Sequence, residues 1–333
     1  MKDLTNYSLL QHNTFGIDAR CRRFLEYEDV QEAMEIARIL RESKEPYLII
    51  GGGSNLLLTH DFEGIVVHSA IKGFEFDGCR MLCASGEKWD DMVAESLKHG
   101  LYGMENLSLI PGDVGASAVQ NIGAYGTEVK DILLNVYVVD IATGRCHIFG
   151  WEECVFGYRQ SRFKQDWRNR YLITAVTYEL SRDFRPRIDY GNIRQELQRR
   201  EIVAPTAEQL RQVIIDIRQE KLPDPAITGN GGSFFMNPVI TRRRYEQLAE
   251  KYPEMPHYKV DSRHEKIPAG WMIDQCGWKG QSLGRAGVYD RQALVLVNRG
   301  GATGQEILDL CQAIQKDVKD KFGIDIHPEV NIV

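Results

Sequence analysis

Residues 109–129 read LIPGDVGASAVQNIGAYGTEV, and this stretch decides how the chain can fold. It holds Gly112, Gly115, Gly123 and Gly126 with hardly any charge. Glycine loses more backbone entropy on folding than any other residue, so such a cluster indicates left-handed turns or a backbone pressed against a ligand. Residues 112–120 predict a turn that opens a short helix, whose free N–H groups would form an anion site suited to a pyrophosphate. Tight packing of the turn without a ligand is the alternative.

A second glycine-rich run, GGGSN at residues 51–55, follows a short apolar strand predicted at 47–50. It does not complete a dinucleotide-binding G-x-G-x-x-G, because position 56 is leucine and a strand-like run, rather than a helix, follows. Its backbone amides and short polar side chains still suit a phosphate. The two glycine-rich runs together predict a site for the two ends of one pyrophosphate. No P-loop or HExxH motif is present.

Composition limits the class of protein. The 333 residues are enough for two or three domains, with 43% hydrophobic and 26% charged residues as in globular proteins. A net charge of −6 without a basic block argues against a nucleic-acid partner. The N-terminus lacks the order of a signal peptide, and no apolar run reaches the length of a membrane span. Seven cysteines without a CxxC predict reduced core thiols, such as Cys79 and Cys83, and no metal. We expect a soluble cytoplasmic protein.

Periodicity predicts an α+β chain. Apolar spacing predicts helices over 30–42 and 304–322, and Pro205-Thr206 predicts the start of another that runs to 222, with Thr206 as its N-cap. Between residues 72 and 180 strands dominate, with one helix over 89–99. Clustered strands with few helices favour α+β over a parallel βαβ array.

A set of motifs then occurs in a fixed order along nearly the whole chain. They are HNTFG (12–16), GGGSNLLL (51–58), GMENLSLIPGDVGASAVQNIGAYG (103–126), FGYRQSRFK (156–164), YGNI (190–193), KLPDP (221–225), GNGGSFFMNP (229–238), AGWMIDQCGWKG (269–280) and HPEV (327–330). In this order they closely resemble the UDP-N-acetylenolpyruvoylglucosamine reductases, flavoenzymes that make UDP-N-acetylmuramate for peptidoglycan, cell-wall growth and cell division.

The resemblance implies an FAD-binding fold of the vanillyl-alcohol-oxidase/PCMH type with a separate C-terminal substrate-binding α+β domain. Residues 1–68 with 315–333 would form the first FAD-binding subdomain, 69–205 the second, and 206–314 the substrate-binding domain. The implied FAD contacts are Gly51, Gly53, Ser54, Asn55, Pro111, Gly112, Gly115, Ala116, Gln120, Asn121, Gly123, Ala124, Tyr125, Gly126 and Arg218. We expect Gly53→Val or Gly115→Val to yield protein without flavin.

The resemblance also implies the chemistry. NADPH is the co-substrate that reduces FAD, and hydride then passes to the methylene carbon of the enolpyruvyl ether. Ser233 would donate the proton to the carbon beside the carboxylate, while Arg159 and Glu329 would polarise that carboxylate. Glu329 serves this purpose only if it is protonated or shares a proton, because a carboxylate repels an enolate.

The remaining implied residues contact the substrate. They are Tyr190, Lys221, Asn237, Tyr258 and Gln292, chiefly at the UDP phosphates and uracil. Tyr190 and Tyr258 favour the subtype with a closing tyrosine loop, in a monomer that acts on this small molecule. The chain carries Asn331 where some relatives have arginine, and it ends four residues after Glu329, so the support of Glu329 is open.

Two other functions stay open at this point. One is an oxidase of sugars or alcohols on the same fold, which would return electrons to oxygen and give no reason for Arg159, Ser233 and Glu329. The other is a non-catalytic nucleotide-sugar binder, which would bind UDP without flavin.

Overall fold

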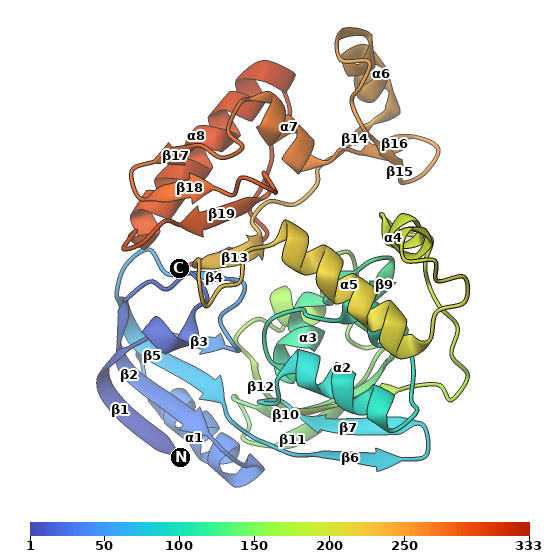
Figure 1. Cartoon of the computed structure of the whole chain (residues 1–333). Helices are drawn as coiled ribbons and strands as arrows, with labels where there is room; N and C mark the ends of the chain where they lie inside the picture. The colour runs from blue at the N-terminus through green and yellow to red at the C-terminus, as the bar shows by residue number, and fades with distance from the viewer. The chain divides into compact units, whose positions relative to one another are not determined.

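The computed structural model describes residues 1–333, which divide into two compact units (Figure 1). The first unit contains Met1–Tyr7, Cys21–Gly53 and Phe62–Arg218. The second contains Ser8–Arg20, Ser54–Asp61 and Gln219–Val333. The two therefore interleave along the first quarter of the chain. No helix combines the length and the apolar character needed to cross a membrane.

The first sheet of the first unit is built around three parallel strands. Its order is β1 (Lys2–Ser8), β2 (Arg20–Tyr27), β5 (Phe62–Ser69), β3 (Tyr47–Ile50), with β2, β5 and β3 parallel. Helix α1 (Val30–Glu42) joins β2 to β3 and begins where the Asp29 carboxylate accepts the Glu32 N–H at 2.8 Å. Its buried face is the predicted stripe of Ala33, Ile36, Ala37 and Leu40. The predictions for 30–42 and 47–50 are confirmed.

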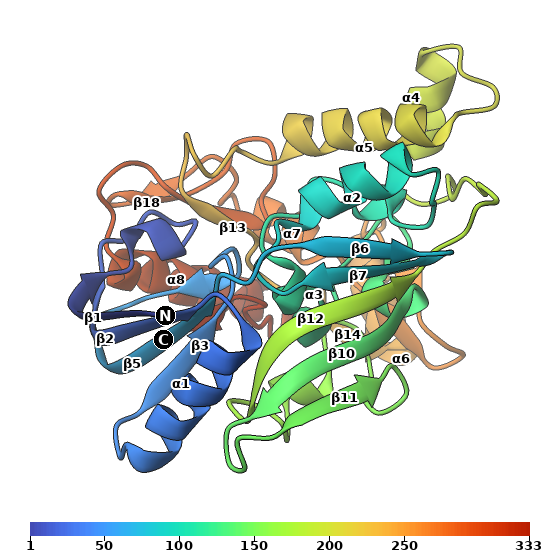
Figure 2. The same cartoon turned by 90° about the horizontal axis from the view of Figure 1, so that it is seen from below.

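The second sheet is antiparallel, as the strand-rich stretch 72–180 predicts. Its order is β11 (Cys146–Gly150), β10 (Leu133–Asp140), β12 (Tyr171–Glu179), β7 (Arg80–Ala84), β6 (Phe74–Asp77) (Figure 2). Helices α2 (Trp89–Lys98) and α3 (Val114–Gln120) share one apolar core with it, through Trp89, Val114 and Ala118. Between α3 and β10 come the hairpin of β8 (Gly123–Ala124) and β9 (Thr127–Glu128) and a short helical turn, η3 (Val129–Asp131).

Two helices complete this unit. They are α4 (Ile193–Arg199) and α5 (Ala207–Lys221), whose apolar faces form a separate small core. Helix α5 begins directly after the predicted N-cap, Thr206, and it ends one residue before the predicted end at 222. The Thr206 hydroxyl accepts the Gln209 N–H at 3.2 Å, and the Gln209 side chain accepts the Thr206 N–H at 2.9 Å, so each satisfies an orphan donor of the first turn.

The second unit holds an antiparallel sheet in the order β13 (Asn230–Ser233), β19 (Val295–Asn298), β18 (Ala286–Val288), β17 (Ser282–Leu283). Helix α8 (Gly304–Phe322) packs on it, with α7 (Ala269–Gln275) beside α8. A capping box of Thr303 and Glu306 starts α8, and left-handed Gly323 (φ 62°) ends it. Predicted helix 304–322 is confirmed and runs unbroken across residue 314. The domain boundaries at 68, 205 and 314 stay predictions.

The second unit also contains a smaller sheet with its own helix and a pair of short strands. Strands β14 (Val239–Thr241), β16 (His264–Lys266) and β15 (Tyr258–Lys259) form a three-stranded sheet next to α6 (Arg242–Lys251). This group stands apart from α8 and its sheet in Figure 1. The terminal strand β20 (Asn331–Ile332) pairs in parallel with β4 (Leu56–Leu57), the strand-like run that follows the GGGSN sequence.

Candidate active site

The turn at Gly51–Gly53 leaves strand β3 at the carboxyl end of the parallel strands, the usual ligand edge of such a sheet. A Cβ on Gly51 would lie 3.0 Å from the Ala116 Cβ, and a Cβ on Gly52 would lie 3.1 Å from the Gly112 Cα. Gly53 is left-handed, with φ 66°. The two glycine-rich runs therefore lie against each other in the first unit, and side chains at 51 or 52 would push them apart.

The start of α3 differs from the prediction of a free anion site. The N–H groups of Val114 and Gly115 donate to the carbonyls of Glu87 at 2.8 Å and Ser85 at 2.9 Å. The Ala116 N–H donates to the Asp113 carbonyl at 3.1 Å. The expectation of free N–H groups at this helix start is therefore wrong at these three positions. Residues 112–114 pair with the chain that enters α2. The Val114 and Gly115 N–H groups therefore donate to that chain, and the Ala116 N–H donates within its own turn.

Gly115 has a packing role in this arrangement. A Cβ at this position would lie 2.9 Å from the Ser85 Cβ and 3.3 Å from the Ser85 carbonyl oxygen. Contacts this short force backbone shifts in a packed core. The alternative of tight packing without a ligand thus accounts for Gly115, whereas a contact between Gly115 and FAD stays a prediction.

Arg159 sits at the tip of a tight turn in the first unit. Gly157 and Gln160 exchange backbone hydrogen bonds of 2.9 and 3.1 Å on either side of it. Arg159 itself has φ 56°, a left-handed conformation that is uncommon outside glycine and that only a restraining environment maintains. Its Nη2 donates to the Gly123 carbonyl at 2.7 Å, which ties the turn to the β8–β9 hairpin.

The hairpin that receives Arg159 is held by Asn121. This fully buried, left-handed residue donates from its side-chain amide to the Gly157 carbonyl at 2.8 Å and to Glu128 at 3.1 Å. Its amide oxygen accepts the Lys130 N–H at 3.2 Å. Asn121 therefore has a structural role in the site, and its contact with the cofactor stays a prediction.

Tyr125 and Gly126 form the tip of the same hairpin, with φ 49° and 77°. A Cβ on Gly126 would lie 3.2 Å from the Cβ of Tyr190, so the first unit brings this predicted substrate residue next to the hairpin. Tyr190 itself is 52% exposed. Burial raises the pKa of the Tyr125 hydroxyl, with Arg218 acting in the opposite direction.

Arg218, on α5, carries an unsatisfied donor. Its Nε is buried without a hydrogen-bond partner, and burial lowers the pKa of its guanidinium. A buried cation with an unused N–H fits a ligand that brings an acceptor, so this observation agrees with the predicted cofactor contact. About two turns earlier on α5, Arg211 binds both Asp90 oxygens at 2.7 and 2.9 Å.

The sequence analysis missed Asp90 and Arg211. Asp90 also accepts the Leu109 N–H at 2.5 Å, so it holds the approach to the glycine-rich run at 112–115. Burial by itself would raise the pKa of Asp90, but Arg211 and the Leu109 N–H outweigh it and lower that pKa. An acidic residue in the first turn of the predicted helix 89–99 is common at any helix start, so the sequence held no sign of this contact.

In the second unit, Ser233 ends strand β13 opposite Val295, and its side chain is exposed. The next residues run antiparallel to the predicted HPEV motif. The Glu329 N–H donates to the Phe234 carbonyl at 2.7 Å, and the Met236 N–H donates to the His327 carbonyl at 2.9 Å. The structure thus brings Ser233 and Glu329 onto neighbouring segments, anchored by the buried rings of Phe234 and Phe235.

The start of β13 explains the HNTFG motif at residues 12–16. The Asn230 N–H donates to the Thr14 carbonyl at 2.9 Å, and the Thr14 hydroxyl donates to the Asn230 carbonyl at 2.6 Å. This pair fixes the strand that ends in Ser233. The motif therefore positions a predicted catalytic residue that lies more than two hundred residues away in the sequence.

Glu329 has local support that involves Asn331. The Asn331 backbone and side-chain amides donate to the Asn55 carbonyl at 3.1 and 3.0 Å, and the Asn55 side chain donates to the Glu329 carbonyl at 3.3 Å. Asn55 and Asn331 thus clamp the backbone on either side of Val330. Asparagine in place of arginine at 331 provides this clamp through its short amide.

The predicted substrate residues of the second unit fall into two groups. Asn237 accepts the Ala269 N–H at 2.9 Å and so caps helix α7, and Gln292 accepts the Leu294 N–H at 3.3 Å. Tyr258, in β15, is 54% exposed, and Lys221 is the last residue of α5. The contacts of all four with substrate stay predictions. Of the remaining predicted cofactor residues, Gln120 accepts from Lys164 at 2.8 Å.

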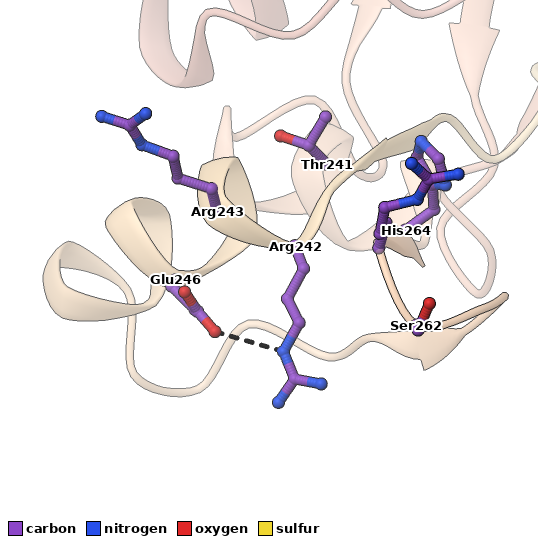
Figure 3. A pocket seen from close by; sticks show the side chains of 7 residues that line it. Thr241, Arg242, Arg243, Glu246, Ser262 and His264 are labelled. Carbon is purple, nitrogen blue, oxygen red and sulfur yellow. Dashed lines mark hydrogen bonds and ion pairs between the residues drawn. The ribbon is translucent and has the colours of Figure 1, made fainter.

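An open hollow of about 580 Å³ lies in the small β14–β16–β15 group of the second unit (Figure 3). Its lining is Thr241, Arg242, Arg243, Glu246, Ser262, Arg263 and His264. The Arg242 guanidinium pairs with Glu246 on the next turn of α6 at 3.2 Å. None of the predicted site residues lines this basic hollow.

Comparisons with known proteins agree with this architecture. Residues 22–150 match the model of an FAD binding domain, and residues 224–333 match that of the UDP-N-acetylenolpyruvoylglucosamine reductase C-terminal domain. The chain is 52% identical to the UDP-N-acetylenolpyruvoylglucosamine reductase of Bacteroides fragilis (strain YCH46), over 98% of this chain and 99% of that protein. It is 44% identical to the reductase of Flavobacterium johnsoniae over the full length of both.

A solved structure shares the fold. The UDP-N-acetylenolpyruvylglucosamine reductase of Thermus caldophilus superposes with a TM-score of 0.69 over 99% of this chain and 98% of its own, at 22% identity. The motifs, the two family models and the full-length identity all agree. The chain belongs to the UDP-N-acetylenolpyruvoylglucosamine reductase family.

Proposed function

We propose that this chain reduces UDP-N-acetylglucosamine enolpyruvate to UDP-N-acetylmuramate, with bound FAD and with NADPH as reductant, for the synthesis of peptidoglycan precursors. The observation that carries the proposal is full-length identity of 52% with a protein named as this reductase, together with an FAD-binding match. The predicted set of Arg159, Ser233 and Glu329 supports it over an oxidase, which has no use for these three residues together.

The residues present fit FAD. Arg218 offers a buried, unused N–H, and the absence of side chains at Gly51 and Gly52 lets the two glycine-rich runs lie against each other. Gly53, Ser54, Gly112, Tyr125 and Gly126 belong to the same predicted contact set. When bound, FAD accepts hydride from NADPH and supplies it to the enolpyruvyl carbon. Residues 1–205 with 315–333 would hold FAD, and residues 206–314 would hold the substrate.

Ser233 is assigned the proton that completes the reduction. Its hydroxyl would donate to the carbon beside the substrate carboxylate as negative charge develops there. The exposed position at the end of β13 leaves that hydroxyl accessible, and the pairing with Val295 and the buried Phe234 fix its backbone. A positioned general acid contributes about 10²–10⁴ in rate.

Arg159 and Glu329 are assigned to the substrate carboxylate. The guanidinium fork of Arg159 matches a carboxylate and holds it more strongly as charge accumulates on it. Its bond to the Gly123 carbonyl fixes where the fork points. Glu329 would donate a hydrogen bond in its protonated form. Its backbone is held between Phe234 and Asn55.

The finer assignments belong to the same proposal. Tyr190, Lys221, Asn237, Tyr258 and Gln292 would bind the nucleotide part of the substrate. The exposed rings of Tyr190 and Tyr258 support a tyrosine loop that closes over it. We further propose that the protein acts as a monomer in the cytoplasm.

The test uses purified protein with its bound flavin, reduced by NADPH without oxygen. UDP-N-acetylglucosamine enolpyruvate is then added while the flavin absorbance is followed. Prompt reoxidation of the flavin is the expected result. A flavin that stays reduced until air enters would instead establish an oxidase, and UDP binding by a flavin-free protein would establish a nucleotide-sugar binder.

A further inference from the structure

Asp113 occupies the position before the first residue of α3 but does not cap the helix. An aspartate there normally accepts an N–H of the first turn and contributes about 1 kcal/mol. In this chain the side chain makes no such bond. Its Oδ1 and Oδ2 would lie 3.2 and 3.3 Å from a Cβ on Gly52, so the carboxylate lies directly against the glycine turn.

A line of buried charged groups holds this carboxylate. His68 Nε2 lies 3.4 Å from Asp113 Oδ2, and His68 Nδ1 lies 2.8 Å from Glu26 Oε2. Lys88 binds Asp113 Oδ1 at 2.9 Å, and Lys2 binds Glu26. The side chains of Asp113, Glu26 and His68 are only 3, 6 and 14% exposed.

The register of the sheet places this line at the ligand edge. Glu26 on β2 lies opposite His68 on β5, and His68 lies opposite Ile50 on β3. Ile50 is the residue before Gly51. The histidine is therefore in register with the point at which β3 gives way to the glycine turn, and the line Glu26–His68–Asp113 connects the ends of β2 and β5 to residues 112–113.

Burying two carboxylates and an imidazole is costly, and an apolar set of the same volume would stabilise the fold equally well or better. Burial alone would raise the pKa of Asp113, but His68 and Lys88 outweigh it and hold that pKa below its usual value. The arrangement thus maintains an ionised carboxylate at a place where stability does not require one.

We propose that Asp113, oriented by His68 and Glu26, is a positioning residue that holds the Gly51–Gly52 turn against residues 112–113 in the form that receives the FAD diphosphate. This inference rests on the proposed function. It assigns roles to two residues, Glu26 and His68, outside the glycine-rich runs.

Because Asp113 is charged, a purely electrostatic role and a positioning role predict opposite changes in FAD affinity when the charge is removed. A carboxylate near a diphosphate repels it, so if Asp113 acts only through its charge, Asp113→Asn should bind FAD more tightly. If Asp113 positions the turn, the same substitution should weaken binding, because the amide offers an N–H where His68 and Lys88 require an acceptor.

The experiment measures the Kd of FAD for the apoprotein by flavin fluorescence, with the Tm of the apoprotein alongside. We expect Asp113→Asn to weaken FAD binding about tenfold or more. The matched control is Asp140→Asn, an equally buried aspartate on β10 that binds Arg170 at 3.4 Å and the Ala142 N–H at 2.8 Å. It should lower the Tm and leave the Kd unchanged.

Two results would overturn the inference. One is unchanged or tighter FAD binding by Asp113→Asn, and the other is an equal loss of affinity in Asp140→Asn. If Asp113→Asn does not fold, Glu26→Gln replaces it, since Glu26 contacts His68 and not the turn; FAD binding should then weaken about threefold or more. Wild-type protein that binds no FAD would instead refute the proposed function.

Discussion

The predicted site residues of the first unit and those of the second unit are held in different ways. In the first unit, Asn121, Gly115 and Gly123 are enclosed by protein, and each one contacts residues from a separate segment. In the second unit, Ser233 and Tyr258 are exposed on strands and are fixed through their backbones. Substitutions at these three residues of the first unit should therefore alter folding and cofactor binding together, and those at Ser233 and Tyr258 should alter turnover alone.

This difference has a physical reason. A resident cofactor needs a rigid backbone surface, which a packed turn provides, whereas groups that react with a diffusing substrate must be reachable from solvent. Two results would contradict this comparison. One is a substitution of an enclosed residue of the first unit that leaves stability unchanged, and the other is a substitution of an exposed residue of the second unit that unfolds the protein. The expected effects below run from the largest to the smallest.

Ser233→Ala should reduce the rate of flavin reoxidation by the enolpyruvyl substrate about 10²–10⁴-fold, because the proposed proton donor is removed. Reduction of the flavin by NADPH and the Tm should stay as in wild type, since the side chain is exposed. Stopped-flow absorbance separates the two half-reactions. Ser282→Ala, an exposed serine on the opposite edge strand of the sheet, is the control. A parallel fall of both half-reactions would refute the assignment.

Gly115→Val should destabilise the apoprotein by about 3 kcal/mol or more, because the new side chain meets Ser85 at 2.9 Å. Urea unfolding measures this loss. Gly150→Val is the matched control, since a Cβ there meets only the Glu153 carboxylate at 3.8 Å. A folded Gly115→Val protein that has wild-type stability but no flavin would show that Gly115 serves the ligand and not the packing.

Arg159→Lys should lower turnover about tenfold to a hundredfold, because an ammonium offers no planar fork for a carboxylate. The bond to the Gly123 carbonyl would also be weakened, so the hairpin of β8 and β9 should loosen. Steady-state kinetics with the enolpyruvyl substrate gives the first effect, and hydrogen exchange at residues 121–128 gives the second. Full activity with lysine would remove Arg159 from the carboxylate site.

Asn237→Ala should cost about 1 kcal/mol, because the Ala269 N–H at the start of α7 loses its partner. Asn237 lies in the second unit but has a structural role, so it is an exception to the comparison between the two units. Thermal unfolding detects the loss, and the KM for the substrate reports any contact with the nucleotide. A changed KM with an unchanged Tm would contradict the capping role.

The effect of Asp90→Asn on stability should be smallest at low pH and should reach its full size at neutral pH. The folded-state pKa of Asp90 lies below its unfolded value of 3.8, so its stabilising contribution is present above that value and is lost as the pH falls through the folded pKa. The wild type should therefore lose stability below about pH 4, and the variant should lose less over that range. Chemical unfolding at pH 3 to 7 tests this; parallel curves would contradict it.

Local patterns in the sequence were sufficient to predict the positions of most helices and strands. The apolar stripes of α1 and α8, the N-cap of α5 and the strands from β6 to β12 follow from spacing and capping within a few residues. The motifs similarly sufficed for the family, because the order of conspicuous residue types along the chain requires no three-dimensional information.

The roles of individual residues needed the tertiary structure. The sequence around Gly115 does not predict its contact with Ser85, and the sequence around Asp113 does not predict the line formed with His68 and Glu26. These contacts join segments that are distant in the sequence. The prediction of free N–H groups at the start of α3 was wrong at Val114 and Gly115 for the same reason, since their acceptors lie in the chain before α2.

The sequence by itself thus determined the α+β class, the position of most helices and strands, and membership of a reductase family. Only the tertiary structure decided that Gly115 serves packing, that Asn237 caps a helix, and that a buried aspartate lies against the glycine turn. The physical reason is the distance along the sequence over which each interaction acts. Backbone propensity and amphipathic spacing act over one or two turns, whereas donors, acceptors and buried charges are matched across the folded chain.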